Sequence, residues 1–273
     1  MEQVFVPDLR LVAAYMISGL ISLTATVAGI IFVRRRYHVE WKYLGYGALV
    51  FLVFQVVTRI PAVVLLQTLL ADTLSSSPTI LILWIGGLAV TAGLFEEVGR
   101  YLGYRYLFKN GRTWRNALMY GVGHGGLEAL LLGTGAMLLA LINYAVVSSA
   151  ALLPGLFPPD QAEQIAQARA LFASIPWWLP LLGGFERVAA LVIQVSMAVV
   201  VLQSFLRHSK LWLYAAIAYH AVVDFVAVMV LRQFGPVQAE FAVGAFALIS
   251  VYLIWALKPR TSERELDVVS RTS

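Results

Sequence analysis

The first group of residues able to do chemistry lies in the stretch GLFEEVGRYLGYRY, residues 93–106. Glu96, Glu97 and Arg100 stand near the end of an apolar run that is long enough to cross a bilayer. An ionised side chain near the bilayer centre costs from about 3 to over 10 kcal/mol, depending on the estimate. Such a group therefore requires an internal polar site. Arg100 lies within one helical turn of both glutamates, so it can neutralise either of them and leave the other available.

Two histidines follow, each with a carboxylate four residues later. His124 and Glu128 occur in GVGHGGLEALL, and His220 and Asp224 occur in AYHAVVDF. Residues four apart share one face of a helix. The glycines around His124 let helix backbones approach closely and are expected to leave space for water or a substrate chain. We therefore expect an internal polar cavity.

Three more charged residues lie within apolar runs. Arg59 precedes Pro61, whose missing N–H leaves a backbone carbonyl for polar groups or water, and Glu186 and Arg187 are adjacent. We interpret Arg59, Glu186 and Arg187 as supporting charges. They either complete the polar site or only hold the helices together.

The composition indicates the elements that must position these groups. Hydrophobic residues make up 60% of the chain, charged residues only 13%, and the mean hydropathy is +0.79. These values predict an all-α, polytopic membrane protein, one domain over residues 1–273 with about seven transmembrane helices. The expected spans are 11–33, 43–71, 79–107, 117–147, 177–206, 211–231 and 238–257. The chain has no cysteine, which excludes disulfides, thiolate catalysis and cysteine-ligated zinc.

The basic residues indicate an orientation. Alternate connections between the spans are basic, and assigning those connections to the cytoplasm places 14 of the 20 Lys and Arg residues there. The connections in question are 34–42, 105–116, 207–210 and 258–273. We predict an integral membrane protein of the bacterial plasma membrane, with its N-terminus outside and its C-terminus in the cytoplasm. The net charge of +5 is spread over helix ends, so we expect no nucleic acid partner.

The polar set permits water-dependent hydrolysis. A buried glutamate beside a histidine can act as a general base on water. A second histidine, oriented by a carboxylate, can stabilise a developing oxyanion. Together these parts predict a hydrolase that works within the membrane.

The motifs also carry a resemblance. The order EEVGR (96–100), GHGGLE (123–128) and HAVVD (220–224) resembles the glutamate-dependent intramembrane proteases. These are the CAAX protease and bacteriocin-processing superfamily, the PrsW-like proteins and, most closely, the YhfC family. In the superfamily the motifs are EExxxR, FxxxH and HxxxN or HxxxD, in an all-helical bundle. In this chain only two residues, and not three, separate the glutamate pair from the arginine. Tyr120 stands in place of the phenylalanine of FxxxH.

The resemblance implies roles for five residues. Glu96 would activate water, Glu97 would support it, His124 would be its partner, and His220 with Asp224 would stabilise the oxyanion. The implied reaction is hydrolysis of a peptide bond in a membrane protein or peptide substrate, with the lipid bilayer as surroundings.

Metal participation is left open by the residues. The simpler mechanism needs no cofactor, and this is what we expect. The alternative is a mechanism that uses a zinc ion. Two histidines with a carboxylate offer three ligands and an open position, the arrangement of catalytic zinc. The candidate ligands are His124, His220, Glu96, Glu128 and Asp224.

Two functions of other classes remain open. Chains of glutamate, histidine and aspartate inside a bundle also serve as proton relays, so a proton- or ion-coupled transporter is one alternative. A catalytically inactive membrane scaffold of the same fold is the other.

Overall fold

The computed structural model describes residues 7–152, 158 and 161–259. All regular structure within these ranges is helical. Among the described residues, seven helical segments are long and apolar enough to cross a membrane. They are Leu9–Tyr37, Trp41–Leu69, Pro78–Tyr106, Trp114–Ser149, Leu179–Leu206, Leu211–Phe234 and Pro236–Ala256. The chain is therefore an all-α, polytopic membrane protein, and each span expected from hydropathy overlaps one of these segments.

The second and fourth segments are not uniform α-helices. The second consists of α2 (Trp41–Phe51), the π-helical η1 (Leu52–Arg59) and α3 (Ile60–Leu69). The fourth consists of α6 (Trp114–Glu128), the π-helical η2 (Ala129–Gly135) and α7 (Ala136–Leu152). The other spans are α1 (Leu9–Tyr37), α5 (Pro78–Tyr106), α9 (Leu179–Leu206), α10 (Leu211–Phe234) and α11 (Pro236–Ala256). Two shorter helices, α4 (Ala71–Ser76) and α8 (Ala162–Ser174), complete the described elements.

The described chain groups into two compact units. The first combines residues up to 25 with residues 128–188, and the second combines residues 26–127 with the chain from residue 189 onward. The expectation from the sequence, that residues 1–273 form a single helical domain, stays a prediction.

The first unit contains the N-terminal part of α1, with η2, α7, α8 and the start of α9. Side-chain hydroxyls join α1 to η2 in this unit. Ser22 Oγ donates to the carbonyl of Ala129 at 3.1 Å, and Thr134 Oγ1 donates to the carbonyl of Gly19 at 3.1 Å. These bonds satisfy polar groups that the bilayer could not solvate.

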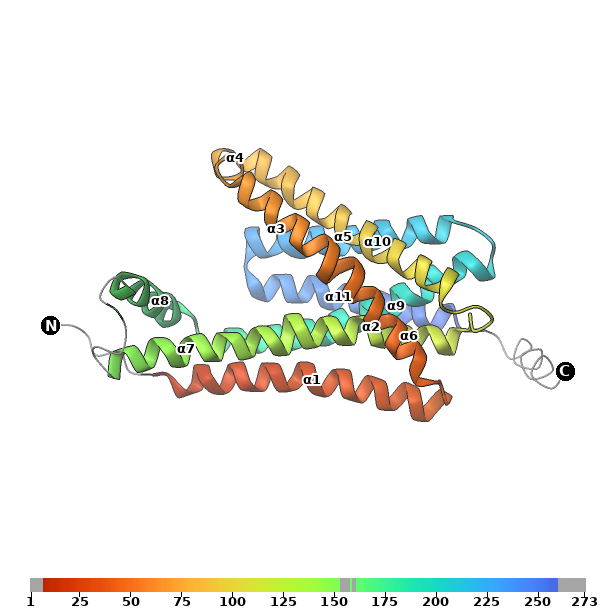
Figure 1. The fold of residues 1–273 in the computed structure, drawn as a ribbon, viewed down its shortest axis with the longest axis horizontal. Helices are drawn as coiled ribbons and strands as arrows, with labels where there is room; N and C mark the ends of the chain where they lie inside the picture. Colours follow the sequence, from red (N-terminus) through yellow and green to blue (C-terminus); the bar gives the residue numbers. More distant parts are fainter. Residues whose placement is uncertain (1–6, 153–157, 159–160, 260–273) are drawn as a thin grey trace. The chain divides into compact units, whose positions relative to one another are not determined.

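The second unit holds the rest of the bundle, where α10 packs along both α5 and α11 (Figure 1). Glycine makes the closest approaches between these helices possible. A Cβ atom on Gly93 of α5 would lie 2.6 Å from the carbonyl oxygen of Ile217 on α10. A Cβ on Gly123 of α6 would clash with the carbonyl of Leu44 on α2. The close approach expected around His124 is therefore confirmed, whereas space for water or substrate stays a prediction.

The π-helical turn η1 ends next to a proline. Pro61 stands in the first turn of α3 and has no N–H to donate to the preceding turn. A wider turn at this point is one way to accommodate the missing hydrogen bond, and single π turns occur often at functional sites. Within η1, Gln55 is buried and faces the polar residues of α5.

Candidate active site

The carboxylate of Glu96 lies at the centre of the polar set. Its Oε2 is 2.9 Å from Nε2 of His124 on α6 and accepts a hydrogen bond from Nε2 of Gln194 on α9 at 3.1 Å. Its Oε1 accepts a hydrogen bond from Nε2 of Gln55 in η1. Glu96 is only 3% exposed, so three other helical segments surround one buried carboxylate.

The neighbouring Glu97 is held differently, by charge. Nη1 of Arg100 donates to Oε1 of Glu97, and both side chains are 0% exposed. The second guanidinium nitrogen, Nη2, donates to Gln194 and lies 3.5 Å from Oε2 of Glu96. Arg100 thus binds Glu97 closely and Glu96 at longer range, so the two adjacent carboxylates have different surroundings.

His220 faces both glutamates from α10. Its Nδ1 lies 2.7 Å from Oε1 of Glu97, and its Nε2 lies 3.9 Å from Oε1 of Glu96. Asp224, one turn later, has its Oδ2 at 3.7 Å from the same Nε2, and its side chain is 39% exposed. The close partner of this imidazole is therefore Glu97, while Asp224 is a longer-range neighbour on the exposed side.

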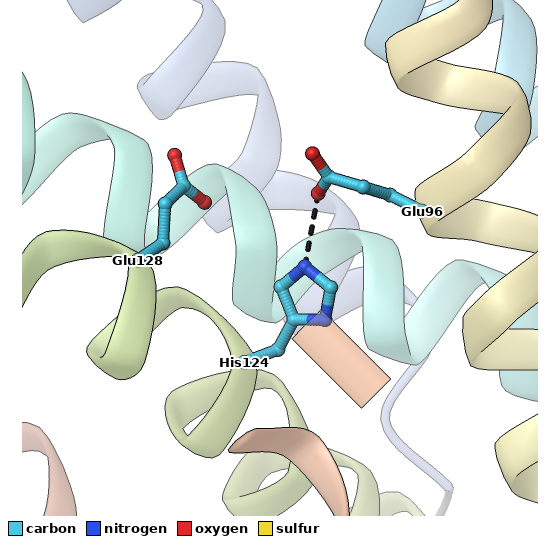
Figure 2. A group of neighbouring side chains, drawn as sticks. All are labelled: Glu96, His124 and Glu128. Carbon is cyan, nitrogen blue, oxygen red and sulfur yellow. Dashed lines mark hydrogen bonds and ion pairs between the residues drawn. The ribbon is translucent and has the colours of Figure 1, made fainter. Parts of the chain in front are cut away.

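His124 is completely buried on α6. Figure 2 shows its hydrogen bond to Glu96, with Glu128 one helical turn further along, at the last position of α6. The ring packs edge-on against Phe51 of α2, with 5.2 Å between the ring centroids. Within the described residues, Nδ1 of His124 has no hydrogen-bond partner. Among the residues that the structure describes, the imidazole therefore hydrogen-bonds to one side chain, the carboxylate of Glu96, which it can orient or protonate.

Two glutamines of the site were not among the residues singled out from the sequence. Gln55 and Gln194 are 7% and 5% exposed, and each donates to Glu96. A buried amide needs hydrogen-bond partners, as a buried charge does, although its burial costs less. A glutamine within an apolar run is the signal that could have found them.

Arg59 reaches the site through Gln55. Its Nη1 donates to Oε1 of Gln55 at 3.3 Å, and its Nη2 donates to the carbonyl of Leu88 at 2.6 Å. Since the other end of the Gln55 amide donates to Glu96, Arg59 fixes the orientation of that amide. Arg59 therefore supports the carboxylate of Glu96 indirectly, through Gln55.

The aromatic residue expected before His124 is also at the site. Tyr120 is 0% exposed, and its hydroxyl donates to the backbone carbonyl of Arg100 at 3.3 Å. Its ring contacts that of Tyr104, with 4.9 Å between the centroids. Tyr120 thus packs against the helix that carries the glutamates.

The remaining supporting charges belong to the first unit. Arg187 donates through Nη2 to Glu186 and through Nη1 to Oε1 of Glu128 at 3.3 Å. One arginine thus lies between two carboxylates from α6 and α9. This is how a bundle accommodates charge within the membrane.

The donor set of the second unit fits a divalent metal ion. One ligand atom from each of Glu96, Glu97 and His220 lies within 4.8 Å of the others. Nε2 of His124 also faces Glu96, at 2.9 Å. Imidazole nitrogens and carboxylate oxygens are ordinary zinc ligands. The contact between Glu97 and Nδ1 of His220 has the form of the carboxylate–histidine pairs that orient metal-binding histidines.

Comparison with known proteins points to one family. A family described as "YhfC intramembrane metalloprotease" matches residues 20–247. The chain belongs to this family. The chain is also 31% identical over 250 residues to a Bacillus subtilis (strain 168) protein described as "Uncharacterized membrane protein YhfC". That match covers 89% of this chain and 94% of the relative. No solved structure matches the chain significantly.

This membership confirms the resemblance to the YhfC family noted in the sequence. It supports the assignment of this chain as an intramembrane protease, and the family's description as a metalloprotease implies a metal ion. The matched residues contain the whole polar set of the second unit, from Gln55 to Asp224.

Proposed function

We propose that this protein is an intramembrane endopeptidase that hydrolyses a peptide bond in a membrane-embedded or membrane-proximal substrate. Family membership supports the class of enzyme. The observation that carries the mechanism is the buried carboxylate of Glu96, which His124, Gln55 and Gln194 contact from three other helical segments. These three side chains hold the carboxylate in place, and Arg100 lies 3.5 Å from it while it binds Glu97 more closely.

Glu96 acts as the general base in this proposal. It takes a proton from water while the water oxygen attacks the scissile carbonyl carbon. The same proton then passes to the amide nitrogen as the carbon–nitrogen bond breaks. The hydrogen bonds from Gln55 and Gln194 hold the carboxylate in one orientation, and His124 shares the proton at Oε2.

His220 and its neighbours stabilise the negative charge that develops on the substrate oxygen. Nδ1 of His220 donates to Glu97, which leaves Nε2 directed toward Glu96 and Asp224. An N–H at that nitrogen is placed to donate to an oxyanion formed beside Glu96. Asp224, whose Oδ2 lies 3.7 Å from the same nitrogen, helps to orient the imidazole by its negative charge.

A metal ion would be held by Glu96, Glu97 and His220, whose ligand atoms lie within 4.8 Å of one another. When bound, it would supply Lewis-acid polarisation of the scissile carbonyl. Glu97 also fixes the tautomer in which Nε2 of His220 can serve as a ligand, because its Oε1 accepts a hydrogen bond from the N–H at Nδ1. Zinc is the ion that this mixed histidine and carboxylate set suits best.

The decisive experiment replaces Glu96 by Gln, which keeps the size of the side chain and removes the base. Purified protein in proteoliposomes is given a set of fluorescent single-span transmembrane peptides, and the products are identified by mass spectrometry. We expect cleavage to fall by about 10²- to 10⁴-fold, the usual contribution of a positioned base. Cleavage at the full rate would rule out Glu96 as the base.

The matched control is Glu40→Gln. Glu40 is exposed and pairs with Lys42 at 2.9 Å, away from the buried set. The Glu40→Gln variant should cleave the peptides at the full rate. Thermal unfolding of both variants shows whether the fold is kept.

The orientation in the membrane is part of the proposal. The basic ends of the spans favour a cytoplasmic C-terminus and an external N-terminus, in the plasma membrane of a bacterium. Cysteine accessibility labelling at Ser209 and at Ser75, in an otherwise cysteine-free chain, tests this arrangement directly.

A further inference from the structure

A cavity of about 440 Å³ lies at one end of the second unit. Its walls come from the C-terminal ends of α1 and α9, the segment after α11 and the start of α6. None of the residues around Glu96 lines it. The volume falls within the range of small-molecule sites, about 300–1,000 Å³, and exceeds what a bare inorganic ion needs.

The lining of this cavity is strongly cationic. Arg36, Arg112, Arg115 and Lys258 contribute permanent positive charges, and His38 adds a titratable one. The lining residues include no aspartate or glutamate. Four like charges around one cavity repel one another, and an anion within it would relieve that repulsion.

Arg112 is held rigidly in the wall. Its Nε donates to the carbonyl of Tyr104 at 2.9 Å, and its Nη2 donates to the carbonyl of Arg105 at 3.3 Å. Its guanidinium also lies over the ring of Phe205, 4.5 Å from the centroid. A fixed cation loses little conformational entropy when a ligand binds.

The start of α6 adds backbone donors to the same cavity. Thr113 precedes the helix, and its Oγ1 accepts a hydrogen bond from the N–H of Asn116 at 3.3 Å. The N–H groups of Trp114 and Arg115 belong to the first turn, which has no acceptor within the helix. Both residues line the cavity. A helix N-terminus combined with arginine side chains is the usual phosphate-binding arrangement.

Aromatic rings form the rest of the wall. Tyr37 and Trp114 meet edge to face with 5.4 Å between centroids, and Nζ of Lys258 lies 5.6 Å from the Trp114 centroid. Tryptophan and tyrosine at the end of a span mark the level of the lipid headgroups. The cavity thus lies where a headgroup is presented, at the end that the proposed orientation places in the cytoplasm.

We propose that this cavity is a binding site for the phosphate of an anionic phospholipid headgroup. The positive lining disfavours headgroups that carry an ammonium group, such as phosphatidylcholine. A glycerol headgroup adds no positive charge to the phosphate and fills more of the cavity than a free ion does. The proposal is independent of the proteolytic reaction.

The test uses two neighbouring arginines of α1. Arg36 lines the cavity and Arg35 does not, although both side chains are exposed in the same basic run. The full chain is purified in detergent, and retention of phosphatidylglycerol is measured by native mass spectrometry. We expect Arg36→Gln and Arg115→Gln each to weaken retention about fivefold, and Arg35→Gln to leave it unchanged.

Two further measurements decide the source of the phosphate. Phosphatidylcholine offered in the same way should be retained less well than phosphatidylglycerol, and inorganic phosphate should not displace the lipid at equal concentration. Equal loss in Arg35→Gln and Arg36→Gln would show only general attraction to a basic surface and would overturn the site. Retention of inorganic phosphate without any preference for phosphatidylglycerol would assign the cavity to a free anion and overturn the lipid ligand.

Discussion

Nδ1 of His220 lies 2.7 Å from Oε1 of Glu97, the same carboxylate oxygen that Arg100 binds through Nη1. The histidine on α10 is thereby tied to the buried ion pair of α5. Its other nitrogen faces Glu96, which Arg100 contacts at 3.5 Å through its other terminal nitrogen, Nη2. We propose that this relationship separates the two adjacent glutamates by function. In the proposed mechanism, Glu97 holds the site together and Glu96 takes part in the reaction.

Glu97→Gln is therefore expected to affect stability more than Glu96→Gln does. Removing the carboxylate of Glu97 takes away the closer charge partner of the buried Arg100 guanidinium and leaves it only Glu96, at 3.5 Å, within the described residues. Breaking a buried ion pair costs about 3–5 kcal/mol. Thermal and denaturant unfolding in detergent should show this loss for Glu97→Gln and a smaller one for Glu96→Gln. Equal losses would contradict the division of roles.

Gln194→Ala tests a positioning residue that the sequence did not reveal. Gln194 donates to Oε2 of Glu96 and accepts from Arg100, so its loss should let the reactive carboxylate turn. We expect kcat to fall about 10- to 100-fold, with a smaller change in KM, as for other residues that orient a reactive group.

The control for this variant is Gln203→Ala. Gln203 is also buried on α9, but it donates to the carbonyl of Val199 and accepts from Arg207. A similar loss of kcat in both variants would point to a general packing effect and not to positioning.

Gly47→Ala tests the close packing behind His124. A Cβ at this position would lie 2.7 Å from the backbone nitrogen of His124 and would also clash with the carbonyl of Tyr120. Overpacking of this kind costs about 1–3 kcal/mol and would displace the histidine. We expect a lower melting temperature together with lower activity.

Gly45→Ala, two residues earlier on α2, is the matched control. A Cβ there meets nothing within 4 Å, and alanine favours a helix over glycine by about 1 kcal/mol. This variant should be as stable as the parent or more stable. If both substitutions destabilised the protein, the loss of stability in Gly47→Ala could not be attributed to the close packing beside Gly47.

Metal content can be measured apart from activity. If Glu96, Glu97 and His220 hold a zinc ion, elemental analysis should find about one per chain, and His220→Asn should reduce it severalfold. A chelator should abolish cleavage, and added zinc should restore it. His208→Asn is the control, because His208 is exposed and its φ of 50° suits asparagine. Activity that resists the chelator in metal-free protein would favour the mechanism by glutamate alone.

Much of the site follows from the sequence because charge within an apolar run is costly. Glu96, Glu97, Arg100, His124 and His220 all stand out in this way, and the structure brings all five together. Hydropathy also places the spans, since each needs roughly 20 apolar residues. Spacing within one helix shows that Arg100 can reach both glutamates.

Contacts between helices could not be predicted in the same way. Spacing along α10 pairs His220 with Asp224, whereas the rotation of α10 against α5 brings Glu97 closer. Nothing in the hydropathy marks the wide turn that directs Gln55 to Glu96. Charge alone also could not show that Arg187 binds Glu128, which is 59 positions away in the chain.

Arg100 and the two glutamates occupy successive turns of the same helix, and this has a consequence for biogenesis. During synthesis α5 emerges before α6, α9 and α10, which later supply His124, Gln194 and His220. Because Arg100 is already within reach of Glu97, the nascent helix can enter the bilayer with one of its negative charges neutralised. The inserting segment thus carries its own counter-ion, and His124, Gln194 and His220 reach the two glutamates only when the later helices arrive.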